Sequence, residues 1–257
     1  MGLGISLAPR SASLADLGPM SIAPTSVEAL ADAVDSLTSL GLRHGGRLIL
    51  EAAKGQLRYA MALHDQAPTD RLADVVGRLA DRAAWALSEV GQHGQARRVF
   101  RLAVDVAATL TTRDAIRVNL AGHHLTTGDP LGAIGLLPDV PDDLPVFAFV
   151  AHATLAHAHA ALGDLQGAMR EIARADSAHA AVSLPNLPEA YRPFASGHAA
   201  HADREAGSAL FALALRYPNR RTIARAEERL NRAIELFGPE RSHAAERCRQ
   251  RLFELVG

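Results

Sequence analysis

The feature that most constrains the fold is a repeat of small residues at a nearly constant spacing. Three glycines, each followed five residues later by an alanine, recur 37 and 35 residues apart: Gly91 and Ala96, Gly128 and Ala133, Gly163 and Ala168. A bulky apolar residue lies four positions after each alanine, namely Phe100, Leu137 and Ile172. A period near this length is typical of proteins built from stacked helical hairpins.

Packing distance explains why this pattern favours paired helices. An alanine early in the second helix of a pair lets its backbone approach the first helix, and the bulky residue one turn later fills the space between them. A glycine at the turn can take the left-handed conformation that commonly ends a helix. We therefore predict an all-α, tetratricopeptide-like helical-repeat solenoid of antiparallel helix pairs.

Apolar periodicity and the positions of Gly and Pro give the expected elements. Residues 1–24 are rich in Gly, Ser and Pro and are predicted to be a flexible tail or linker remnant, followed by one helical-repeat domain over residues 25–257. A capping box at Thr25 and Glu28 would start the first helix. Only Leu144 to Val150 resembles a strand. The helices are expected at 25–44, 47–66, 70–91, 94–110, 113–128, 130–137, 146–163, 166–181, 194–215, 222–237 and, as a capping helix, 243–256.

Composition excludes several classes of protein. A net charge of −1 argues against a chain built mainly to neutralise phosphates, and a single cysteine, Cys248, cannot form an internal disulfide. No run approaches the roughly 18 apolar residues that a membrane span needs, so we expect a cytoplasmic protein without membrane contact. Glycine motifs for nucleotides and the nucleophile elbow are missing, which predicts a non-enzymatic protein without a cofactor.

Groove positions on the first helix of each pair carry the candidate ligand-binding residues. Asn, Arg and His side chains on a concave surface suit a peptide backbone or a carboxylate. Two alternatives stay open, because a single Trp at helical spacing often fills space in a core and the charges could simply solvate the groove. The candidates are Arg78, Asp81, Trp85, Asn119, His157, His201 and Arg204.

Other patterns have simpler interpretations. His198, His201 and Glu205 share one helix face and could bind a metal, although no HExxH pattern accompanies them and His is abundant. Arginines at 221, 225 and 229 form a stripe that could meet an acidic partner or nucleic acid, but interleaved glutamates favour a solvated face. Cys248 has no neighbouring His that would activate it as a nucleophile.

The chain resembles the tetratricopeptide-like sensor region of Xre-type helix-turn-helix transcription regulators from high-GC bacteria. The residues that carry this resemblance are Arg43-His44-Gly45-Gly46, Ala84-Trp85, Gly91 to Ala96 with Phe100, Ala160 to Asp164, Pro239 to Ser242, and the linker-like Ser13 to Gly18. Only 12 residues precede Ser13, too few for a helix-turn-helix domain, so DNA would be bound only through a missing N-terminal domain.

The resemblance implies a sensor that holds a peptide, a small effector or a partner protein in its groove and forms a homodimer. The alternative is a stand-alone protein-protein adaptor with no role in transcription. A third interpretation, from a different class, is a metalloenzyme that uses the histidines.

Overall fold

The computed structural model describes residues 24–137, 140, 144–183, 187–195 and 198–256, and within them it contains helices and no strand. The predicted tail lies almost wholly outside these residues, as does the Thr25 side chain of the expected capping box. Leu144 to Val150, the strand-like run, leads into a helix and forms its first turns. The α-helices are α1 (Pro24–His44), α2 (Gly46–Gln66), α3 (Asp70–Glu89), α4 (His93–Val106), α5 (Leu110–Thr126), α6 (Pro130–Leu136), α7 (Pro145–Leu162), α8 (Leu165–Ala180), α9 (Arg192–Ala195), α10 (His198–Arg216), α11 (Arg220–Leu236) and α12 (Ser242–Val256).

The glycines of the repeat do what the pattern predicts. Gly91, Gly128 and Gly163 have φ of 80°, 75° and 81°, in the left-handed region that ends a helix. The buried alanines mark the close approach of paired helices, since Ala96 and Ala168 are fully buried. The helices therefore pack in pairs, with α3 against α4, α5 against α6, α7 against α8 and α10 against α11.

Two of the turns share a capping arrangement that the repeat pattern did not include. Asp164 accepts a hydrogen bond from the Gly167 amide at 2.8 Å, and His159 Nδ1 lies 2.9 Å from the same carboxylate. A Cβ at Gly167 would come within 2.1 Å of Asp164 Oδ2, so only glycine fits there. The same arrangement recurs one unit earlier, at His124, Asp129 and Gly132.

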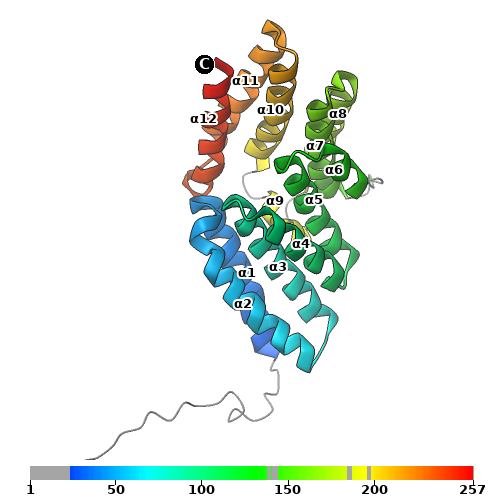
Figure 1. Ribbon diagram of the computed structural model, residues 1–257, viewed down its shortest axis with the longest axis vertical. Helices are drawn as coiled ribbons and strands as arrows, with labels where there is room; N and C mark the ends of the chain where they lie inside the picture. Colours follow the sequence, from blue (N-terminus) through cyan, green and yellow to red (C-terminus); the bar gives the residue numbers. More distant parts are fainter. Residues whose placement is uncertain (1–23, 138–139, 141–143, 184–186, 196–197, 257) are drawn as a thin grey trace, which may run out of the picture.

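The inner helices α1, α3, α5, α7, α10 and α12 each contact the next, and α12 returns to contact α1. Figure 1 shows α12, in red, meeting the N-terminal helices, in blue. Glu89 of α3 stabilises the contact between α12 and the N-terminal helices, because His243 Nε2 and Arg247 Nη1 of α12 each lie 3.1 Å from its Oε1. Ser242 Oγ also donates to the Arg43 carbonyl at 2.9 Å. The helix pairs thus form a ring.

Residues 189–195, here called the plug segment, pack against the ring helices α3, α5, α7 and α10. They comprise a 3₁₀ turn, η3 (Glu189–Tyr191), and α9, where the sequence predicts a loop followed by one helix from Phe194 to Leu215. Tyr191 is fully buried, with its ring centroid 6.0 Å from that of Phe147. Glu189 forms an ion pair with Arg78 of α3 at 3.0 Å. These contacts hold the plug segment across the ring.

One further boundary and one expectation differ from the prediction. Helix α4 ends at Val106 rather than at 110, because Thr109 is the N-cap of α5 and accepts from the Thr112 amide at 3.3 Å. Among the described residues α7 alone is long and apolar enough to cross a membrane, which the sequence did not predict. However, 67% of that stretch is buried inside the fold. This is compatible with the core helix of a soluble protein.

Candidate functional site: a cavity in the middle of the ring

A cavity of about 630 Å³ lies in the middle of the ring. Its size is within the range of small-molecule binding sites. Side chains from α3, α4, α5, α7, α10 and α12 form its walls, and Phe194 of the plug segment faces it from one side. The lining residues are Trp85, Ser88, Glu89, Phe100, Val118, Asn119, Gly122, His123, Leu125, Thr126, Phe149, Val150, Thr154, His157, Phe194, His201, Arg204, Glu205, Ser208, His243, Arg247, Gln250 and Arg251.

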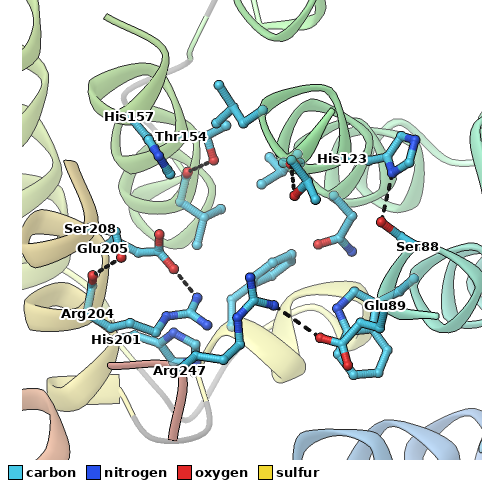
Figure 2. Close-up of a pocket in the computed structure, with 18 of the residues that line it drawn as sticks. Ser88, Glu89, His123, Thr154, His157, His201, Arg204, Glu205, Ser208 and Arg247 are labelled. Carbon is cyan, nitrogen blue, oxygen red and sulfur yellow. Dashed lines mark hydrogen bonds and ion pairs between the residues drawn. The ribbon is translucent and has the colours of Figure 1, made fainter. Parts of the chain in front are cut away.

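The wall formed by α10 and α12 carries most of the charge. Arg204 and Arg247 extend toward the same part of the cavity from these two helices (Figure 2). Arg204 forms an ion pair with its neighbour Glu205, while its Nε is buried without a hydrogen-bond partner. Arg251 lies one turn beyond Arg247 on α12 and also lines the cavity. Three guanidinium groups therefore face this space.

The opposite wall holds a carboxylate that is already committed to the fold. Glu89 Oε2 accepts from the Gly46 amide at 2.9 Å, and its other oxygen faces His243 and Arg247. Burial opposes ionisation, but the hydrogen bonds from His243 and Gly46 hold the pKa of Glu89 below its usual value. Glu89 is therefore an anion that joins α3, α2 and α12.

Two histidines of the lining are neutral at physiological pH. Burial is the main reason that the pKa of His157 falls to about 4, and the charge of Arg251 adds to it. The pKa of His123 also falls to about 4, again chiefly through burial. His123 Nδ1 lies 2.9 Å from Ser88 Oγ, as Figure 2 shows. Neither imidazole adds positive charge to the cavity at neutral pH.

A glycine in the middle of α5 keeps part of the cavity open. Gly122 lines it, and a Cβ built on this residue would meet no atom within 4 Å. A glycine inside a helix costs about 1 kcal/mol relative to alanine. No backbone contact requires a glycine at this position. The absence of a side chain at Gly122 therefore serves to enlarge the cavity.

The structure brings five of the seven predicted groove residues to this cavity. They are Trp85, Asn119, His157, His201 and Arg204. Trp85 also packs between helices, as the alternative interpretation held, because a Cβ on Gly41 of α1 would lie only 2.9 Å from its Cζ3. Trp85 therefore contributes both to the core and to the cavity wall.

Arg78 and Asp81 lie instead on the far side of the plug segment, beside a void of only about 20 Å³ that Ala190 and Pro193 also line. Arg78 is 7% exposed and pairs with Asp35 of α1 at 2.6 Å. These two candidates are thus turned away from the cavity.

The contacts of Asp81 are all within the protein. Its carboxylate accepts from Arg82 Nη2 at 2.5 Å and from Asn119 Nδ2 at 2.9 Å. Helical spacing correctly points both Arg78 and Asp81 inward, but the plug segment separates them from the cavity. They serve packing between α1, α3, α5 and η3.

The candidate metal ligands are used differently. His201 Nε2 lies 2.7 Å from Arg241 Nη1, and Glu205 contacts Arg204; the His198 side chain lies outside the described residues. Within the described part of the chain, no three His, Cys, Asp or Glu side chains are grouped to hold a metal. Cys248 is fully buried, and burial raises the pKa of its thiol.

Within the arginine stripe, Arg221 is exposed, as expected of a solvated face, whereas Arg229 is engaged in ion pairs. Arg229 of α11 pairs with Asp176 of α8 at 2.6 Å and with the buried Asp203 of α10 at 2.9 Å. Arg232 adds a second ion pair to Asp203 at 2.6 Å. Arg229 and Arg232 therefore join neighbouring helix pairs.

Four cavity residues on α12, namely His243, Arg247, Gln250 and Arg251, were missed because this helix is predicted only as a cap. His243, Arg247 and Arg251 are spaced four residues apart, so they share one face of the helix. That stripe of basic side chains was a signal available in the sequence. What the sequence does not reveal is that this face meets α1 and α3.

Comparisons with protein-family models, with curated proteins and with solved structures find no match for this chain. The chemistry of the cavity is therefore the basis for assigning a function.

Proposed function

We propose that this protein is a non-enzymatic sensor or interaction domain that binds a small effector in the cavity of the ring. The observation that carries the proposal is a 630 Å³ space enclosed by six helices and the plug segment, lined by a mixture of aromatic, neutral polar and charged side chains. Such a mixture binds and orients organic molecules. In this proposal the fold is a tetratricopeptide-like solenoid whose superhelix closes on itself.

A small effector suits this site better than a long segment of another protein. A groove that accepts an extended chain has two open ends, whereas here the plug segment fills the ring on one side. A short peptide remains a reasonable ligand, since the plug segment is itself a peptide held inside the ring. The adaptor function requires a partner that enters the same space.

The route from ligand to output would run through the closure of the ring. His243 and Arg247 line the cavity and also contact Glu89. A ligand that binds either side chain would compete with Glu89 for it and so change the packing of α12 against α1 and α3. Coupling of this kind needs differential binding to two states. By resemblance, a cytoplasmic transcription regulator would pass this change to a dimer partner or to an N-terminal DNA-binding domain.

A pair of glycine substitutions tests whether the cavity binds a ligand. Gly122→Leu places a side chain in the cavity, while Gly55→Leu in α2 adds the same side chain where nothing lies within 4 Å outside the cavity. Both replace a helical glycine and should raise the free energy of unfolding by about 1 kcal/mol. Only Gly122→Leu should abolish binding.

The readout is native mass spectrometry of the full chain purified without denaturation, followed by identification of any released compound. A small molecule that accompanies the parent protein and Gly55→Leu, but not Gly122→Leu, supports the proposal. A co-purifying polypeptide that is lost with Gly122→Leu supports the adaptor function instead. Ligand retained by Gly122→Leu contradicts both.

A further inference from the structure

The charges that line the cavity are unevenly balanced. Arg204, Arg247 and Arg251 face it from α10 and α12, against the carboxylates of Glu205 and Glu89. Glu205 forms an ion pair with Arg204. Glu89 forms ion pairs with Arg247 and His243 and accepts a hydrogen bond from the Gly46 amide. Both carboxylates in the lining are thus already paired.

Arg251 is left over in this arrangement. It forms no hydrogen bond or ion pair with any part of the chain that the structure describes. Burial, and then the neighbouring charge of Arg247, lower its pKa from the usual value, and the charge of Glu205, which is already paired with Arg204, opposes this shift without reversing it. An arginine held in a partly desolvated space beside another arginine is unfavourable unless an anion joins them.

Arg204 has a second feature that points to a ligand. The Nε of Arg204 is buried without an acceptor. This unpaired N–H group is an observation separate from the balance of charges, and it also indicates that a hydrogen-bond acceptor is missing from the cavity.

We infer that the ligand of the cavity is a small organic anion whose carboxylate or phosphate group is held by Arg204, Arg247 and Arg251. Guanidinium groups bind both kinds of anion through paired, charge-assisted hydrogen bonds. The rest of the ligand would lie against the apolar side chains that α5 and α7 contribute, among them Val118, Leu125 and Val150. This inference rests on the proposed function, because it gives the chemical class of the effector.

The test compares anions and two matched arginine variants of the full chain. Thermal unfolding is followed in sodium phosphate and in sodium succinate, each against sodium chloride at equal ionic strength. Arg251→Gln removes the unpaired guanidinium. Arg249→Gln, on the same helix, removes an exposed arginine whose carboxylate partner is Glu246.

Phosphate, succinate or both should raise the melting temperature of the parent protein beyond the effect of chloride, and the anion that acts identifies the acidic group. Arg251→Gln should raise the half-maximal anion concentration about tenfold or more, whereas Arg249→Gln should change it less than about twofold. If Arg251→Gln loses its helix content, Arg251→Met serves in its place, because it preserves the length of the side chain.

No stabilisation beyond chloride, or equal losses from the two arginine variants, would overturn the inference. A neutral compound that co-purifies with the parent protein and is lost with Gly122→Leu would also overturn it, while leaving the proposed function intact. If the anions fail and no compound of any kind co-purifies, the proposed function fails as well.

Discussion

The plug segment divides the interior of the ring into two regions that carry arginines in different states. On its far side, Arg78 and Arg82 are buried against Asp35, Glu189 and Asp81. On the cavity side, Arg251 has no such partner in the described part of the chain, although it comes from the same kind of inward helix position. An inward-facing arginine therefore indicates a ligand only where the protein does not itself supply the anion.

The largest expected loss of stability comes from a substitution on the far side of the plug segment. Asp81→Asn leaves Arg82, which is 7% exposed, without its carboxylate, and should lower the free energy of unfolding by about 3 kcal/mol. Asp114→Asn is the control, because it breaks the more exposed pair with Arg117 and should cost less than about 1 kcal/mol. Urea denaturation followed by circular dichroism measures both. Equal losses would remove the distinction between the two regions.

A pH titration should reveal the neutral histidines on the cavity side. Because the pKa of His157 in the folded protein is about 4 and its ordinary value is 6.5, the unfolded chain binds more protons between these two pH values. The stability contributed by neutral His157 is present above pH 6.5 and should decline by about 3 kcal/mol as the pH falls to about 4, with His123 adding a similar loss.

The variant His157→Gln should make this part of the pH profile less steep. His44→Gln, at an exposed position at the end of α1, should leave the slope as it is in the parent protein. An unchanged slope in His157→Gln would show that this imidazole does not stay neutral inside the cavity.

The helices could be predicted because their signals are local. Gly91 and Gly163 end their helices in the left-handed region, and Ala96 and Ala168 are buried where the pattern places a close approach. The 3₁₀ turn and the short helix α9 were not predicted, because the plug segment is held by distant partners rather than by its own sequence. Tyr191, for example, is buried against Phe147 of α7.

The candidate site could be predicted only in part, for a similar reason. Spacing along a helix tells which side chains share a face, and this correctly directs Trp85, Asn119 and Arg204 inward. Closure of the ring depends on contacts such as Arg247 with Glu89, which are 158 residues apart in the chain. No local pattern encodes that meeting, so the basic face of α12 was not connected with the groove.

The smallest expected change in stability is also the most direct test of the central claim, that the cavity side is built for an anion rather than for stability. The measurement is the free energy of unfolding of Arg251→Gln in chloride, without any other added anion, beside the parent protein and Arg249→Gln. Relief of the repulsion between Arg251 and Arg247 should leave Arg251→Gln as stable as the parent, or more stable by up to about 1 kcal/mol. A loss close to the 3 kcal/mol expected for Asp81→Asn, on the order of a broken buried ion pair, would show that Arg251 belongs to the framework of the fold and would contradict the account.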